Sequence, residues 1–173
     1  SAYRDPSFLT VRHLLVPPWT QQEFEQVLAQ APELGRALED APAKLRQLAE
    51  VPFNTRLIYE LLQSGVVAQT LRDLASQAQL LRLFWDRRIV PLGAAAEACL
   101  RQVVQSMVDT RTLRASTAAA SERYPDAFDS LCLRGVLIRV ENDRYVQFRH
   151  HLLFDYVASR LLLDPDGIVS GRL

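Results

Sequence analysis

The chain has 173 residues, which is enough for one sizeable domain or for two small ones, each with its own core. Hydrophobic residues make up 49% of it and charged residues 23%, a balance typical of folded proteins rather than disordered ones. The 20 basic side chains equal the 20 acidic ones, so the net charge of zero provides no broad attraction to nucleic acid or to a membrane surface.

The two ends of the sequence carry weak structural signals. Residues 1–16 predict an extended segment, because the double proline that follows, Pro17-Pro18, cannot continue a helix. The tail, residues 166–173, matches no element that would close a domain. We therefore expect the chain to be part of a longer protein.

The next stretch, up to Gly65, predicts a compact bundle of short helices. Thr20 and Glu23 have the spacing of a capping box, with Trp19 and Phe24 at the positions of a hydrophobic staple. Prolines that recur every ten residues can each occupy the first turn of a helix, where the missing N–H costs nothing. These prolines are Pro32, Pro42 and Pro52.

The hydrophobic period changes near the C-terminal end. Helices are predicted before that change over 68–89, over 92–109 after Pro91, over 116–122, and over 125–133 with Gly135 as its stop. The runs VLIRV (136–140) and RYVQF (144–148) then predict a β-hairpin, and a helix over 150–163 closes the unit.

This order of elements is typical of a winged helix-turn-helix with an added C-terminal helix. The sequence therefore predicts a mainly α fold, in which a small helical bundle is followed by a winged helix-turn-helix with one β-hairpin. The predicted division is an extended segment at 1–16, a helical bundle at 17–90, a winged-helix domain at 91–165 and a tail at 166–173.

Two of the three histidines, His150 and His151, stand side by side at the start of the last predicted helix. At 100° per residue they face different ways. His151 shares a side with Asp155, which predicts a solvated pair. His150 shares a side with Leu153 and Val157, so it faces the core or a cleft. A hydrogen-bonded core histidine and a ligand-binding histidine both remain open for that position.

The sequence contains no catalytic or metal-binding constellation that we can identify. Adjacent helical residues cannot converge on one ion, and the third histidine, His13, lies far away in the extended segment. Neither GxSxG nor GxxxxGK[ST] occurs. We expect no catalytic residue, no metal ligand and no phosphate-binding loop in this chain.

The two cysteines and the hydropathy favour a cytoplasmic location. Cys99 and Cys132 lie in apolar patterns without a CxxC pair, which favours buried, reduced thiols in an intracellular protein. No signal peptide is found, and no apolar run approaches the roughly 20 residues that span a bilayer. We expect no membrane partner.

Four stretches in order carry a resemblance to a known family. They are VPPWTQQEF, LAEVPFNTRLIYELL, LLRLFWDRRI and SLCLRGVLIRV…YVQFRHHLLFDYVASRLL, within about residues 10–163. Together this region resembles the part downstream of the nucleotide-binding core in STAND-type ATPases. These are signal-transduction NTPases of the AAA+ superfamily, related to NACHT and apoptotic ATPases. The resemblance implies that 1–16 links the chain to a missing P-loop core and that 17–90 is a helical lid.

The resemblance also implies particular binding residues. Pro52 of VPFN resembles the lid proline that packs against the adenine, and Arg56 lies where many AAA+ lids carry a sensor arginine for the γ-phosphate. His150 resembles the histidine of the winged-helix Met-His-Asp triplet, which contacts the β-phosphate of ADP and holds the closed state. Here the triplet reads Arg149-His150-His151, and many bacterial members vary there. A first-turn proline and a surface pair of Arg56 with Glu60 explain the first two residues without a nucleotide.

The function implied is therefore regulatory. The chain itself would be no enzyme, and the parent protein would be an ATPase that binds ATP or ADP with Mg²⁺ in its P-loop domain. The lid and winged helix would close over that nucleotide and relay a nucleotide-dependent switch. The P-loop domain of the same chain is the expected partner, with self-association of the parent as a further expectation.

The alternative is a winged-helix regulator that binds DNA. The predicted recognition helix, 125–133, argues against it, because Asp126 and Asp129 would point outward and repel phosphates. Its central turns also have no Asn, Gln or Arg to read base edges. Arginines near the predicted wing leave a weak contact to the nucleic-acid backbone open. They are Arg139, Arg144 and Arg149.

Overall fold

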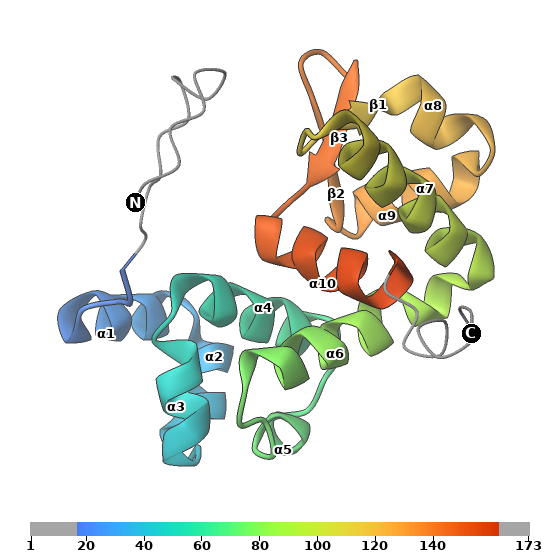
Figure 1. Ribbon diagram of the computed structural model, residues 1–173. Helices are drawn as coiled ribbons and strands as arrows, with labels where there is room; N and C mark the ends of the chain where they lie inside the picture. The colour runs from blue at the N-terminus through green and yellow to red at the C-terminus, as the bar shows by residue number, and fades with distance from the viewer. Residues whose placement is uncertain (1–16, 163–173) are drawn as a thin grey trace, which may run out of the picture. The chain divides into compact units, whose positions relative to one another are not determined.

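The computed structural model describes residues 17–162, and the chain divides into two compact units. The N-terminal unit ends at Gln77, and the C-terminal unit begins at Ala78. Both units are mainly helical, and the C-terminal unit also contains a small antiparallel sheet (Figure 1). The predicted mainly α fold is confirmed. The predicted extended segment 1–16, with His13, and the predicted tail 166–173 lie outside the described residues.

Short helices joined by tight turns build the N-terminal unit. They are α1 (Gln21–Gln30), α2 (Pro32–Glu39), α3 (Ala43–Ala49), α4 (Pro52–Gln63) and α5 (Ala68–Leu71). Pro32 and Pro52 are the first residues of their helices, as predicted, and Pro42 directly precedes α3. The buried aliphatic side chains of this unit come mainly from α2, α3 and α4. They include Leu34, Leu38, Leu45, Leu57, Ile58 and Leu61.

The predicted capping box at the start of α1 is confirmed. The Thr20 hydroxyl accepts a hydrogen bond from the Glu23 amide at 3.3 Å, and the Glu23 carboxylate accepts one from the Thr20 amide at 2.8 Å. The indole Nε1 of Trp19 donates to Thr55 Oγ1 at 2.9 Å, which ties the start of α1 to α4. The hydrogen bonds from the Thr20 backbone and then from its hydroxyl lower the pKa of Glu23 below its ordinary value.

Replacing Glu23 by Gln is expected to lower the stability of the N-terminal unit at neutral pH and to have little effect in acid. The folded-state pKa of Glu23 is depressed, so its ionised form stabilises the fold above the unfolded pKa. That contribution is lost as the pH falls through the folded pKa. Urea unfolding of both proteins at about pH 7 and about pH 3, on either side of the ordinary glutamate pKa, measures the effect. A difference of equal size at both pH values would contradict the role of the charge.

The helix predicted over 68–89 is interrupted. It forms α5 and then α6 (Gln77–Arg88), and between them the Leu74 amide donates to the Leu71 carbonyl at 3.0 Å. A tertiary contact fixes the start of α6, because the buried Asn54 accepts a hydrogen bond from the Gln77 side chain at 2.8 Å. The hydrophobic periodicity of the sequence alone does not predict this contact.

The C-terminal unit has the element order of a winged helix-turn-helix. A 3₁₀ turn (Val90–Leu92) leads into α7 (Ala94–Thr110), followed by β1 (Ala115–Ser116), α8 (Thr117–Glu122), α9 (Pro125–Leu133), β2 (Leu137–Val140), β3 (Tyr145–Phe148) and α10 (His151–Leu162). The strands are antiparallel in the order β1-β3-β2, with β3 in the centre. The predicted hairpin is confirmed. The third strand, β1, was not predicted because two residues are too short to show an alternating pattern.

The long helix α7 packs against α10 and α9 and forms the centre of this unit. It supplies buried side chains from several turns, among them Cys99, Leu100, Val103, Val104 and Met107. On the predicted apolar side of the last helix, Leu153, Val157 and Leu161 are buried, whereas His150 and Phe154 are half-buried; α10 packs against α7. Within residues 17–162, none of the helices has the length and apolar character needed to cross a bilayer.

Most of α6 belongs with the C-terminal unit, so the division falls earlier than the 90/91 position that we predicted. Phe84 and Trp85 are buried, and the Trp85 ring meets Tyr156 of α10 edge to face, with centroids 6.2 Å apart. Arg88 Nη2 also donates to the carbonyl oxygen of Arg134 at 2.6 Å. These contacts join α6 to residues far along the chain.

Gly135 ends α9 in a left-handed conformation, with a φ of 68°. A Cβ at this position would lie 2.9 Å from Nη1 of Arg149. Gly135→Ala is therefore expected to cost about 1–2 kcal/mol for the backbone and a further amount for moving the guanidinium. Urea unfolding measures the total cost.

The control is the same substitution in an Arg149→Ala background. There the backbone cost remains and the contact with the guanidinium is absent. Equal costs in the two backgrounds would show that Arg149 moves aside freely.

Candidate functional site

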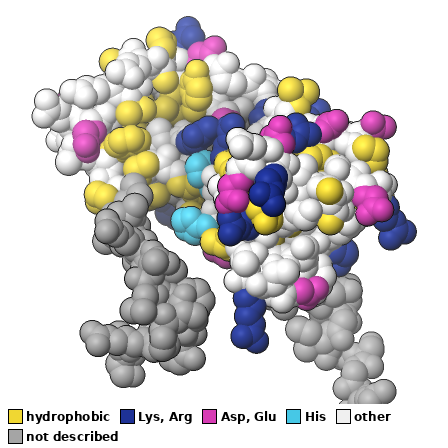
Figure 2. Space-filling view, turned by 90° about the horizontal axis from the view of Figure 1, so that it is seen from above, with side chains coloured by type: hydrophobic (Ala, Val, Ile, Leu, Met, Phe, Trp, Pro, Cys, Tyr) yellow, Lys and Arg dark blue, Asp and Glu magenta, His cyan; other side chains and the backbone are white. Residues whose placement is uncertain are grey.

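His150 lies where β3 passes into α10. It is the residue just before the helix, and its carbonyl accepts hydrogen bonds from the amides of Leu153 at 3.0 Å and Phe154 at 3.3 Å. The helix therefore begins one residue later than predicted. His150 is half-buried and His151 is exposed, and histidine side chains are visible on the surface in the space-filling view (Figure 2).

His150 lines a small pocket of about 220 Å³, which we call the His150 pocket. Two aromatic rings in it, Phe148 and Phe154, meet edge to face with centroids 5.9 Å apart. The Nε2 atom of His150 is shielded from solvent. The complete lining is Leu113, Gln147, Phe148, Arg149, His150, His151 and Phe154.

The chemistry of the His150 pocket suits an anionic group. Its polar lining residues are Arg149, Gln147 and the two histidines, and none of its lining residues is a carboxylate; the guanidinium of Arg149 lies beside Gly135. An imidazole can donate a hydrogen bond to a phosphate, a guanidinium fork fits phosphate well, and the start of a helix favours negative charge. Pockets for drug-sized ligands hold about 300–1,000 Å³. This pocket is therefore of a size for one phosphate group rather than a whole nucleotide.

The other two candidate residues, Pro52 and Arg56, lie one turn apart on α4. Pro52 is half-buried in the first turn. The Arg56 side chain is 48% exposed, and its Nε donates to Glu60 Oε1 at 2.9 Å. The surface pair that we weighed for Arg56 is thus present. Pro52 and Arg56 belong to the N-terminal unit and His150 to the C-terminal unit.

The two thiols differ in their environment. Cys99 is buried, as predicted, and desolvation first, then the neighbouring Cys132, raises its pKa to about 11. Cys132, which was also predicted to be buried, is only half-buried, and it lines a concave surface between α9 and β2. Burial is also the main cause that raises the pKa of Cys132. Since the thiolate is the reactive form, neither group is poised as a nucleophile near neutral pH.

The helix α9, at the position of a recognition helix, exposes carboxylates as predicted. Asp126 and Asp129 are exposed, whereas Phe128 and Leu131 are buried. Arg139 on β2 forms an ion pair with Asp129. This face therefore combines exposed acids with a cation that is already paired, a poor surface for the phosphates of nucleic acid.

Several residues of the His150 pocket escaped the sequence analysis. The aromatic pair joins the last residue of β3 to the first turn of α10, and Leu113 comes from the loop before β1. No periodic pattern connects these positions. Within the described part of the chain, no three His, Cys, Asp or Glu side chains gather in a way that could hold a metal ion.

The resemblance to STAND-type ATPases depends on the sequence patterns themselves. Comparisons with protein-family models, with curated proteins and with solved structures find no match for this chain.

Proposed function

We propose that this chain is the regulatory lid and winged-helix part of a bacterial, cytoplasmic STAND-type ATPase. The observation that carries the proposal is the position of His150 at the start of α10, in a small pocket whose lining includes two histidines, an arginine and a glutamine and no carboxylate. Such a pocket suits a single phosphate group presented by another domain. The P-loop domain of the parent would hold the nucleotide and its Mg²⁺, and the parent would be the ATPase.

In this proposal His150 donates a hydrogen bond to the β-phosphate of ADP, and Pro52 packs against the adenine. Both contacts hold the two units against the P-loop domain. Replacing ADP by ATP removes the advantage of the closed state, so the population shifts towards an open one that exposes a surface for assembly. The different contacts made with the two nucleotides are the source of the switch.

Arg56 can serve such a switch. Its partner Glu60 lies four residues along the same helix, and the Arg56 side chain is half exposed. Helical pairs with this spacing contribute about 0.3–0.5 kcal/mol when both side chains are exposed, and here the Glu60 side chain is 17% exposed, so this pair costs more than that to open. A γ-phosphate, with more charge and several acceptor oxygens, would compete effectively for the guanidinium.

Binding of DNA remains the second candidate, because the C-terminal unit has the element order of a winged helix-turn-helix. Two measurements on this chain alone separate the candidates. Calorimetry is expected to detect little or no binding of ATP, and a gel shift with random-sequence DNA should show at most weak binding that physiological salt abolishes. Micromolar binding of ATP would contradict the regulatory proposal. A complex with DNA that survives physiological salt would favour the alternative.

A further inference from the structure

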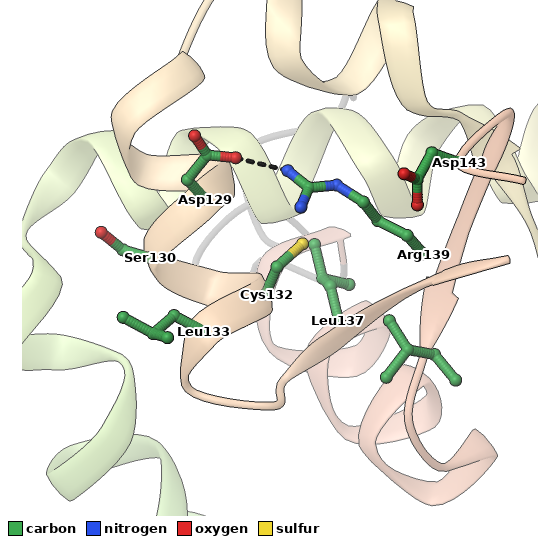
Figure 3. A pocket seen from close by; sticks show the side chains of 8 residues that line it. Asp129, Ser130, Cys132, Leu133, Leu137, Arg139 and Asp143 are labelled. Carbon is green, nitrogen blue, oxygen red and sulfur yellow. Dashed lines mark hydrogen bonds and ion pairs between the residues drawn. The ribbon is translucent and has the colours of Figure 1, made fainter.

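A second concave surface lies between α9 and β2, which we call the α9–β2 groove (Figure 3). It encloses about 780 Å³ and shares no lining residue with the His150 pocket. Its lining is Asp129, Ser130, Cys132, Leu133, Leu137, Ile138, Arg139 and Asp143. The groove is therefore a separate feature, and the proposed nucleotide switch makes no use of it.

The middle of the groove is apolar. Leu137 is fully buried beneath it, Ile138 is half-buried, and Cys132 contributes a thiol whose raised pKa keeps it uncharged. Leu133, at the end of α9, is 90% exposed. A single exposed leucine is ordinary, but this one stands beside other apolar groups in a concavity, where a ligand side chain could cover it.

The edge of the groove is acidic. Asp129 on α9 and Asp143 in the β2–β3 turn lie on either side of Arg139, which pairs with Asp129 (Figure 3). Both carboxylates act on the Cys132 thiol to raise its pKa, and the Arg139 guanidinium acts to lower it. Two negative charges thus face one positive charge, which leaves the groove with a negative excess.

The turn that carries Asp143 is itself unusual. Glu141, Asn142 and Asp143 have φ values of 53°, 54° and 64°, in the left-handed region that non-glycine residues rarely adopt. Such conformations cost energy and persist where the surrounding structure enforces them, often at binding surfaces. Here the turn holds a carboxylate at the edge of an apolar groove.

We propose that the α9–β2 groove binds a segment of a partner protein in which an arginine or lysine neighbours an aliphatic side chain. The aliphatic group would cover Leu133, Ile138 and Cys132, and the cation would meet Asp143 and the Oδ2 atom of Asp129. The volume of the groove falls in the range of about 300–1,000 Å³ that is typical of pockets for drug-sized ligands. The same carboxylates would repel the phosphates of nucleic acid.

Short synthetic peptides test the proposal through the amide spectrum of the ¹⁵N-labelled chain. One peptide alternates arginine with leucine, a second alternates glutamate with leucine, and a third alternates arginine with serine. The arginine–leucine peptide is expected to shift the amide signals of residues 129–143. The other two are expected to bind at least about tenfold more weakly, because each lacks one of the two interactions.

Four variants locate the site. Leu133→Ser and Asp143→Asn are each expected to weaken binding of the arginine–leucine peptide about tenfold, which corresponds to about 1.4 kcal/mol. Val108→Ser and Asp109→Asn are the matched controls, because both residues are exposed at the end of α7 and do not line the groove. They should bind the peptide like the parent chain. The unchanged amide signals of the core confirm that each variant is folded.

Several results would overturn the proposal. Equal binding of the glutamate–leucine peptide would remove the charge argument, and equal binding of the arginine–serine peptide would remove the apolar one. Shifts located away from residues 129–143 would place the site elsewhere. If sedimentation shows a dimer that Leu133→Ser dissociates, the occupant is a second copy of the chain. If DNA shifts the same signals at physiological salt, the occupant is nucleic acid.

Discussion

The proposed regulatory function predicts that His150→Ala, introduced into the proposed parent ATPase, weakens the retention of ADP and raises the basal activity. A hydrogen bond to a charged group contributes about 1.5–3 kcal/mol, which corresponds to roughly a ten- to hundredfold faster release of ADP. The imidazole of His150 lines a pocket with no other histidine but its exposed neighbour His151. The dissociation of a fluorescent ADP analogue and the rate of ATP turnover measure the two effects.

The neighbouring histidine provides the control for this experiment. His151→Ala removes an exposed imidazole one residue away, in the first turn of α10, and should leave both measurements nearly unchanged. Thermal unfolding of both variants shows whether the fold is intact. If His150→Ala leaves the release of ADP and the basal activity as they were, His150 is not a nucleotide contact, and the regulatory proposal loses its main support.

Local signals in the sequence predicted several elements closely. The helix α9 has the predicted bounds, Pro125–Leu133, because a proline fits its first turn and Gly135 can adopt the positive φ that stops it. The β2–β3 hairpin and the buried stripe of α10 also match their predicted periods. Each of these features depends on residues that are close in sequence.

Features that depend on distant residues were not predictable in this way. The helix breaks between α5 and α6 where Gln77 donates a hydrogen bond to Asn54. The boundary between the two units falls before Trp85, which contacts Tyr156 of α10. Strand β1 exists because Ala115 and Ser116 pair with β3, which follows much later in the chain. Hydrophobic period alone cannot reveal which of several partners a side chain meets.

The candidate site likewise has one feature that the sequence predicts and others that it does not. His150 could be singled out from the sequence, because a histidine on the apolar side of a helix is unusual and can be recognised from spacing. The rest of its pocket could not, since Phe148, Phe154 and Leu113 come together only when β3, α10 and the loop before β1 are packed. The α9–β2 groove escaped prediction for the same reason. It depends on the exposed Leu133 of α9 lying beside Leu137 and Ile138 of β2, which no local pattern in the sequence reveals.

Trp85→Ala is expected to be the most destabilising single substitution in the C-terminal unit. The side chain is 1% exposed, meets Tyr156 edge to face and lies beneath the guanidinium of Arg160, 4.9 Å from its ring centre. Truncating a buried tryptophan leaves a large cavity and costs about 3–5 kcal/mol. Urea unfolding followed by circular dichroism measures this loss.

A second variant at Trp85 shows which property of its side chain matters, and a variant at Trp19 gives the comparison for the N-terminal unit. Trp85→Phe keeps most of the ring and removes an indole N–H that has no hydrogen-bond partner among the described residues, so it should cost far less than Trp85→Ala. Trp19→Ala removes the half-buried tryptophan of the N-terminal unit and its hydrogen bond to Thr55, and a loss of about 1–3 kcal/mol is expected there. A loss below about 1 kcal/mol for Trp85→Ala would be inconsistent with a filled core at this position. In that case α6 would not be an integral part of the C-terminal unit, and the predicted division at 90/91 would describe the chain better than the division at Gln77.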